Sequence, residues 1–402
     1  MKLASLLFST TVSAISIQPP ADVRELLDER QSCAPKTHVF FHKKHKSASS
    51  TLSAIMKDWS KKNRMKMAKT PVPAFLGGYP ASFNDTLVRG LPDDDGKFDV
   101  ILHHLRFDEQ NLQKVLYDDT VYMTSMRSPL SHFVSAFEFF YKRFANTENM
   151  ENRAKGESLI CWGAPYMQIL NNEIGKTAND FIATVGDNYD PNMPWHFRAK
   201  NFQGYELGFD TMLESDEEIE NAWELTDRRF DLIMITEYYW ESLILMKDLL
   251  CMSWIDLYID SRTVGAYEKP TFTESEVAKF KDFNRLDEFI YQKSNSTFWD
   301  RVQERPGGVT KMEADVAKLK SLYAFCNDNV KECYDIKMSK KAPRSKRATV
   351  EEVPTYDTRV ELIDGIMEAM EHGYGSCDLG FYQRYKDASP GEREALANID
   401  TL

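Results

Sequence analysis

The feature that most constrains the fold is an order of elements that repeats along the chain: a short apolar run, a polar loop and a helical pattern. The runs are rich in β-branched and aromatic side chains, as buried strands are, and they cover 37–42, 98–103, 121–126 and 229–236. Apolar residues recur at helical spacing after the first, third and fourth runs. Strands that alternate with helices predict an α/β fold with a doubly wound parallel sheet.

Two polar loops, 43–51 and 127–135, follow the first and third predicted strands. Ligands of a parallel sheet bind beyond the carboxyl ends of its strands, so we expect both loops at one edge. In the first loop, Lys46 is followed by small and hydroxyl-bearing residues at the start of a predicted helix: Ser47, Ala48, Ser49, Ser50 and Thr51. Hydroxyls and helix N-terminal amides suit an anion. The GxxxxGK[ST] pattern is absent, which disfavours a nucleoside-triphosphate kinase.

The second loop offers a different anion site. Arg127 ends the third predicted strand, and Ser135 follows about two helical turns later. A guanidinium fork and a hydroxyl can hold a second phosphate. Pro129 fits the first turn of the helix and Ser128 is a candidate N-cap. Two anion sites at one edge suit a nucleotide with a phosphate at each end of its ribose. The alternatives are an ion pair for Arg127 and a serine-rich cap with solvated lysines for the first loop.

Charge and composition exclude some classes of function. The chain has 402 residues and a formal net charge of −12, which argues against a general nucleic-acid binder. No internal run of about 18 apolar residues occurs, so we expect no internal membrane span. Residues 1–20 have the cationic start and short apolar stretch of a secretory signal peptide, or of an uncleaved signal-anchor.

The six cysteines form no CxxC pair and no cluster with the spacing of a structural zinc site. Secreted chains permit disulfides, and Cys326 and Cys333 are the best candidates for a local pair. The glycosylation sequons at Asn84 and Asn295 fit a secretory protein, although such triplets also arise by chance. These features predict passage through the secretory pathway.

The two loops also carry a family resemblance. The segment His45–Thr51 is similar to the 5′-phosphosulfate loop of sulfotransferases, and 127–137 is similar to their 3′-phosphate motif. Four later segments support the likeness in the same order: 205–210, 230–243, 283–287 and 295–299. Over residues 37–325 the chain resembles the galactose-3-O-sulfotransferases, Golgi carbohydrate sulfotransferases that include the galactosylceramide sulfotransferase.

That resemblance implies a P-loop-like sulfotransferase fold with helical insertions, and 3′-phosphoadenosine 5′-phosphosulfate (PAPS) as the sulfate donor. The acceptor it implies is a galactose hydroxyl, the 3-OH, in a glycolipid or glycan. The 5′ phosphosulfate would lie on Lys46, Ser47, Ala48, Ser49, Ser50 and Thr51, and the 3′-phosphate on Arg127 and Ser135. The family loop usually has glycine where this chain has Ala48. A positive φ there would cost about 1 kcal/mol with alanine.

The transfer needs a cation at the bridging oxygen and a base for the acceptor proton. Lys46 is the candidate cation. His104, and after it His103, are the candidate bases, because they end the second predicted strand and imidazole titrates near neutrality. The pair is also similar to the histidine-bearing stretch of the heparan sulfate 2-O-sulfotransferases. Glu237 is the rival base, and the histidines have the alternative of a structural role. We expect no metal ion, because this chemistry requires none.

Three segments are predicted: a signal peptide or signal-anchor at 1–20, the sulfotransferase domain at 36–335, and a charged linker with a helical tail at 336–402. The family implies Golgi localisation, and membrane association would run through the N-terminus. Two other functions stay open: O-sulfation of a uronic acid or N-acetylgalactosamine in a glycosaminoglycan, and silent glycan binding. The aromatic clusters at 238–240 and 298–299 are predicted to belong to the core rather than to stack on a sugar.

Overall fold

The computed structural model describes residues 19–29, 32–68, 76–88, 96–142, 163–173, 175–193, 195–260 and 269–339. Within them a four-stranded parallel sheet has the order β2-β1-β3-β4. Its strands are β1 (Val39–His42), β2 (Val100–Ile101), β3 (Val121–Met126) and β4 (Leu232–Ile235). The α/β class and the parallel sheet predicted from the sequence are confirmed.

The register of the sheet brings the carboxyl ends of its two central strands near each other, with β3 two residues longer at that end. β1 pairs with β3 from Val39 opposite Val121 to His42 opposite Thr124. The loops that follow these strands therefore start side by side at the carboxyl edge. β2 is shorter than the predicted 98–103 run, because only Val100 and Ile101 join the ladder.

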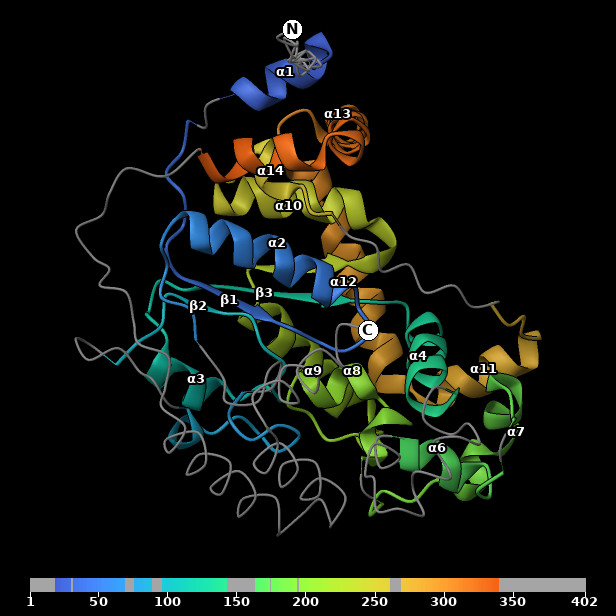
Figure 1. The fold of residues 1–402 in the computed structure, drawn as a ribbon. Helices are drawn as coiled ribbons and strands as arrows, with labels where there is room; N and C mark the ends of the chain where they lie inside the picture. Colours follow the sequence, from blue (N-terminus) through green and yellow to red (C-terminus); the bar gives the residue numbers. More distant parts are fainter. Residues whose placement is uncertain are drawn as a thin grey trace, which may run out of the picture.

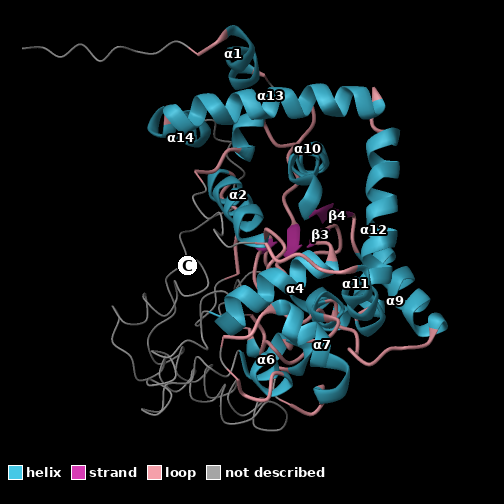
Figure 2. Ribbon diagram, turned by 90° about the vertical axis from the view of Figure 1, so that its right-hand side faces the viewer, coloured by secondary structure: helices cyan, strands magenta, loops and turns pink. Residues whose placement is uncertain are grey.

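Helices cover both faces of the sheet. Their bounds are α1 Ala21–Asp28, α2 Ser49–Lys62, α3 Glu109–Val115, α4 Pro129–Phe137, α6 Ala164–Ile169, α7 Ala178–Asn188, α8 Phe202–Glu206, α9 Asp216–Arg229, α10 Tyr239–Leu250, α11 Glu274–Phe283, α12 Arg285–Glu304, α13 Gly308–Asp328 and α14 Val330–Ser339. In Figure 1, α2 and α10 lie on one face, and α3, α8 and α9 lie on the other. Figure 2 shows α12 running from α13 past β4 towards α9. This arrangement places α8 and α12 beneath the loops of the carboxyl edge.

The apolar side chains form two clusters. The larger one surrounds the sheet, and the second joins α4 to α6, α7 and α11. The aromatic side chains of α4 and of the π-helical turn that follows it, Glu138–Lys142, belong to the second cluster: Phe133, Phe137 and Tyr141 are buried there. Phe298 is buried in the larger cluster, and Tyr238 and Trp299 pack against it, which confirms their prediction as core.

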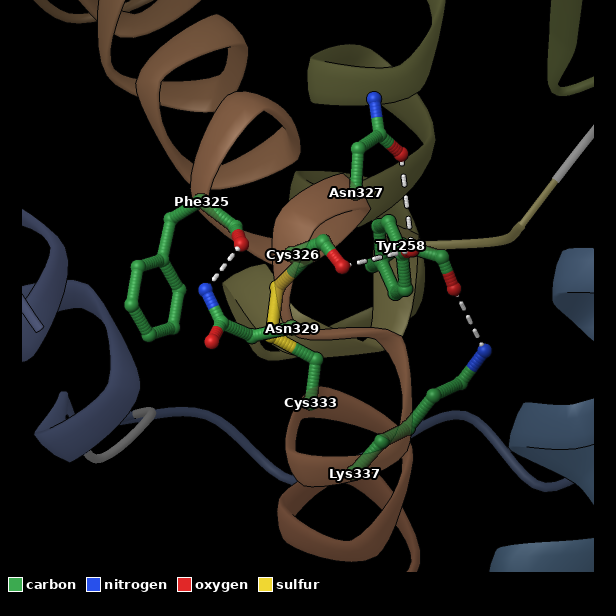
Figure 3. The surroundings of a disulfide bond; sticks show 7 residues. All are labelled: Tyr258, Phe325, Cys326, Asn327, Asn329, Cys333 and Lys337. Carbon is green, nitrogen blue, oxygen red and sulfur yellow. Dashed lines mark hydrogen bonds between the residues drawn. A yellow bond between two sulfur atoms is a disulfide. The ribbon is translucent and has the colours of Figure 1, made fainter. Parts of the chain in front are cut away.

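Two disulfides tie the helical layer beyond α10 together. Cys326 and Cys333 are bonded, as predicted, at the junction of α13 and α14 (Figure 3). Tyr258 donates from its hydroxyl to the Cys326 carbonyl at 3.0 Å and accepts at its own carbonyl from Lys337. A second disulfide, Cys33–Cys251, was not predicted. It fixes the segment that precedes β1 to the end of α10.

Several predictions fall outside the described residues. They are the leader at 1–18, most of the linker and tail after 339, and part of the mostly helical insertion that the sequence indicates at 145–200. The described part of that insertion is helical, with α6 and α7 followed by a 3₁₀ turn, His196–Arg198. In the described ranges, none of the helices has both the length and the apolar character needed to cross a membrane. The division into three segments stays a prediction.

Candidate active site

The two polar loops contact each other directly at the carboxyl edge of the sheet. Arg127 donates from Nη1 to the carbonyl oxygen of Lys46 at 3.1 Å. His132, on α4, donates from Nε2 to the carbonyl oxygen of His45 at 2.8 Å. A carbonyl only accepts, so this bond places the proton of His132 on Nε2. The loops therefore form one continuous surface, as the strand order predicts.

The first loop turns sharply into α2 and leaves helix amides available. Lys46 and Ala48 both have left-handed backbone angles, with φ of 56° and 57°. The first helical hydrogen bond runs from Leu52 N–H to the Ala48 carbonyl at 3.2 Å. The N–H groups of Ser49, Ser50 and Thr51 therefore precede the helical ladder. Backbone N–H groups at a helix N-terminus, with the positive end of the helix dipole behind them, bind anions.

Two of the loop hydroxyls hold the loop itself. Ser47 and Ser49 are buried, and both donate to the carbonyl oxygen of Lys44. Ser47 also shares a 2.8 Å hydrogen bond with the hydroxyl of Ser125 on β3. Ser50 is exposed and Thr51 is half-buried. The prediction that all four hydroxyls contact the donor stays a prediction, and in this structure Ser47 and Ser49 stabilise the turn.

Two lysines of the loop have different environments. Lys46 is half-buried, and its ammonium lies 3.9 Å from the ring centroid of Phe139, a cation–π contact. Lys44, which the sequence analysis did not single out, is fully buried and hydrogen-bonds the sulfur of Met126. Burial lowers the pKa of Lys44 to about 8, against the opposing effect of nearby carboxylates. Of these two lysines, Lys46 is the one that solvent partly reaches.

The backbone of the second loop is held by side chains from distant segments. Gln203, on α8, accepts from the Arg127 N–H at 2.9 Å and donates to the Arg127 carbonyl at 2.8 Å. Glu237 accepts from the Ser128 N–H at 3.0 Å. Ser128 occupies the predicted N-cap position of α4, but its side chain makes no capping hydrogen bond, and Pro129 begins the helix as predicted. Ser135 lies on α4 and is buried.

Glu237, the rival base of the sequence analysis, is an exposed residue in the 3₁₀ turn Thr236–Tyr238 after β4. Its second carboxylate oxygen accepts from the Tyr291 hydroxyl at 3.4 Å. Together with the bond from Ser128, this contact shows a carboxylate that supports the Arg127 loop. A catalytic role for Glu237 stays a prediction.

The candidate bases lie beside the first loop. The ring of His104 stacks on that of His45, with centroids 3.8 Å apart, and His104 is 4% exposed. Burial, with the charges of His45 and Lys43, holds the pKa of His104 well below its usual value. Burial and nearby lysines likewise lower the pKa of the half-buried His103 to about 3. These lowered pKa values keep both imidazoles neutral, and they also make both weaker bases than an exposed histidine.

Glu206 is a site residue that the sequence analysis missed. It is fully buried on α8, and it accepts from the His45 backbone N–H at 2.9 Å and from His45 Nδ1 at 2.5 Å. The Tyr79 hydroxyl donates to the same carboxylate at 3.2 Å. Burial alone would raise the pKa of Glu206, but His45 outweighs it and the pKa is lowered. The segment 205–210, which carries part of the family resemblance, contained the signal.

His45, His104 and Glu206 are close enough together to be considered as metal ligands. One ligand atom each from His45, His104 and Glu206 lies within 4.8 Å of the others. The stacked rings of the two histidines are only 18° from parallel, and imidazole lone pairs lie in the ring plane. Their lone pairs therefore lie in separate, nearly parallel planes and do not converge on one ion. The geometry fits a hydrogen-bonded pair better than a metal centre.

Taken together, these residues can hold one ligand with two anionic ends. Helix amides and Lys46 form one end, and Arg127 forms the other, 3.1 Å from the first loop's backbone. Neutral imidazoles stand beside them, with pKa values lowered by burial. An anion held by amides and cations next to a proton acceptor is the arrangement that group transfer to a hydroxyl needs.

Comparison with known proteins identifies similar chains. The family model described as galactose-3-O-sulfotransferase matches residues 2–160 and 153–338. The human galactosylceramide sulfotransferase is 27% identical over 328 residues, which cover 79% of this chain and 70% of that protein. Galactose-3-O-sulfotransferase 2 of Sus scrofa is 28% identical over 338 residues, covering 80% and 78%. Galactose-3-O-sulfotransferase 4 of Bos taurus is 23% identical over 355 residues, covering 72% and 69%.

Proposed function

This chain belongs to the galactose-3-O-sulfotransferase family of enzymes, and we propose that it transfers the sulfuryl group of PAPS to the 3-hydroxyl of a galactose residue in a glycolipid or glycan. Its relatives include a galactosylceramide sulfotransferase and a galactose-3-O-sulfotransferase, which supports a galactose acceptor. The single observation that carries the proposal is the bond of Arg127 to the Lys46 carbonyl at 3.1 Å. This bond joins the two candidate anion sites to each other. A nucleotide with a phosphate at each end of its ribose needs two anion sites that lie close together.

The donor's two ends would be held differently. The amides of Ser49, Ser50 and Thr51 would bind the 5′ phosphosulfate, in the manner of a P-loop-like turn. The guanidinium of Arg127 would bind the 3′-phosphate, where a bidentate fork gives both affinity and orientation. The fit rests on the left-handed turn at Ala48, which directs the helix start towards the carboxyl edge.

The transfer breaks the bond between sulfur and the bridging oxygen of the 5′-phosphate and forms a bond between sulfur and the sugar oxygen. Negative charge grows on the bridging oxygen, and Lys46 would stabilise it more in the transition state than in the ground state. The proton of the sugar hydroxyl would pass to His104, which lies beside the first loop, and the bound sulfate donor would have to offset the cost that burial sets on the imidazolium. Residual 3′-phosphoadenosine 5′-phosphate then leaves.

The proposal is tested by sulfate transfer from radiolabelled PAPS to galactosylceramide and to a soluble β-galactoside, with linkage analysis of the product. We expect Lys46→Ala and Arg127→Ala to lower kcat/KM at least about 100-fold, since each removes a charge contact to the donor. Lys61→Ala, an exposed lysine at the end of α2, is the matched control and should retain wild-type activity. Normal turnover by both site variants would refute the assignment. With chondroitin added as a third acceptor, a product formed on chondroitin alone would replace galactose as the proposed acceptor.

The same assay addresses the base. His104→Ala should lower kcat about 100-fold or more while 3′-phosphoadenosine 5′-phosphate still binds, because proton transfer and not donor affinity is removed. Equal loss in His103→Ala with none in His104→Ala would transfer the role to the neighbouring histidine.

The proposal extends to localisation in the secretory pathway, at the Golgi lumen. The disulfides Cys33–Cys251 and Cys326–Cys333 support it, because disulfides persist in oxidising compartments. In intact microsomes the chain should resist added protease until detergent is present. Digestion without detergent would place the folded part on the cytoplasmic side and contradict the proposal.

A further inference from the structure

The five-residue helix α8 contacts both anion-binding loops. It is buried throughout, and it supplies polar side chains from opposite ends: Gln203 from its first turn and Glu206 from its last residue. Gln203 reaches the Arg127 loop, and Glu206 reaches the His45 side of the first loop. Neither residue is part of the anion sites themselves. Their contacts are to the backbone of the loops, to the His45 ring and, for Glu206, to the Tyr79 hydroxyl.

Gln203 fixes the peptide of Arg127 from both sides. Its amide oxygen accepts from the Arg127 N–H at 2.9 Å, and its amide nitrogen donates to the Arg127 carbonyl at 2.8 Å. Gln203 is fully buried, so loss of the pair would leave two shielded backbone groups without these partners. The two-point contact therefore sets where the Arg127 side chain begins.

Glu206 fixes the first loop in the same manner. One carboxylate oxygen accepts the backbone N–H of His45 at 2.9 Å, and the other accepts the His45 ring at 2.5 Å. His45 immediately precedes Lys46, and its carbonyl is held by His132. The position of the left-handed turn that opens α2 therefore depends on Glu206.

α8 is itself anchored on α12. The carboxylate of Asp287 accepts from the N–H of Gln203 at 3.0 Å and from the N–H of Gly204 at 2.7 Å. A Cβ at position 204 would lie 2.6 Å from the Leu286 side chain, so a larger residue there would require Leu286 or α8 to shift. Burial raises the pKa of Asp287 to about 6, although it accepts these bonds. α8 therefore connects α12 to both loops through hydrogen bonds of buried side chains.

We propose that α8 sets the spacing of the two donor-binding loops, with Gln203 as the positioning residue for the 3′-phosphate site and Glu206 as the positioning residue for the 5′-phosphosulfate site. This inference rests on the proposed donor. Because each loop is held by a separate side chain, damage to one should spare recognition at the other end of the nucleotide. That selectivity distinguishes positioning from a general contribution to folding.

The test is equilibrium binding of three nucleotides to the full chain: 3′-phosphoadenosine 5′-phosphate, adenosine 5′-monophosphate and adenosine 3′-monophosphate. The ratio of dissociation constants measures what each phosphate contributes. We expect Gln203→Met to lower the contribution of the 3′-phosphate about tenfold and to leave that of the 5′-phosphate within threefold. Glu206→Gln, which keeps the shape and removes the charge, should show the opposite pattern.

Tyr258→Phe is the matched control, because it removes a buried hydrogen bond at the Cys326–Cys333 disulfide (Figure 3) and none at the loops. It should lower the melting temperature and leave both phosphate contributions unchanged. Equal loss of both contributions in each α8 variant, or unchanged contributions with a lowered melting temperature, would overturn the inference. A wild-type chain that gains nothing from either phosphate would instead refute the proposed donor.

Discussion

The left-handed alanine that opens α2 gives a quantitative prediction. Ala48 has a φ of 57°, where an L-residue with a Cβ costs about 1 kcal/mol relative to glycine. Glycine also has more conformational freedom in the unfolded chain, which offsets roughly half of that difference. Ala48→Gly should therefore raise the free energy of unfolding by about 0.5 kcal/mol. Ala48→Val should lower it by about 1–2 kcal/mol, because a β-branched side chain tolerates this region worst.

Ala54→Gly, one turn further along α2, provides the control of opposite sign. Its backbone is helical, so the same exchange should lower the free energy of unfolding by about 1 kcal/mol. Urea unfolding measures these changes, and kcat/KM for PAPS reports on the loop. The loop already holds the left-handed turn with alanine, so Ala48→Gly should change kcat/KM by less than about threefold. If both glycine variants were destabilised alike, the backbone at position 48 would not be left-handed in solution.

Two further predictions concern stability. Burial lowers the pKa of His132 from 6.5 to about 3, so its unfolded form binds the extra proton and stability should fall as pH drops from 6.5 towards 3. His132→Gln keeps a donor for the His45 carbonyl and removes the titrating ring. It should reduce the slope of the free energy of unfolding against pH by about 1 kcal/mol per pH unit. Urea unfolding at several pH values measures this slope, and an unchanged slope would contradict the prediction. Replacing Cys33 and Cys251 by serine should lower the free energy of unfolding by about 5 kcal/mol, because their disulfide spans 218 residues of sequence. The same change at Cys326 and Cys333, which are 7 residues apart, should lower it by about 2–3 kcal/mol. Equal melting temperatures for the two double-serine variants would refute this prediction.

Local patterns predicted the sheet and the two loops, because strands and loop starts are encoded in contiguous residues. The runs that became β1, β3 and β4 are short and apolar, and Arg127 directly follows one of them. The sequence also raised the possibility of a positive φ at Ala48. It gave no reason to expect one at Lys46.

The supporting side chains were not predictable in the same way. Gln203, Glu206 and Asp287 act through contacts with residues 76 or more positions away, or through helices that pack only in the finished fold. Glu206 and Asp287 do lie in segments of family resemblance, 205–210 and 283–287. The resemblance marked these segments but did not indicate what either side chain contacts. The Cys33–Cys251 pairing could not be derived because cysteine spacing does not determine connectivity.

The anchoring of α8 on α12 has a consequence for the synthesis and folding of this enzyme. Its anchor, Asp287, is synthesised long after the loop motifs at 45–51 and 127–135 have left the ribosome. A chain that stops short of α12 carries both loops and α8, and it lacks the carboxylate that accepts from the N–H groups of Gln203 and Gly204. Possession of the loop motifs and a firmly anchored α8 are therefore separate properties, and truncation before α12 would keep the first and remove the second.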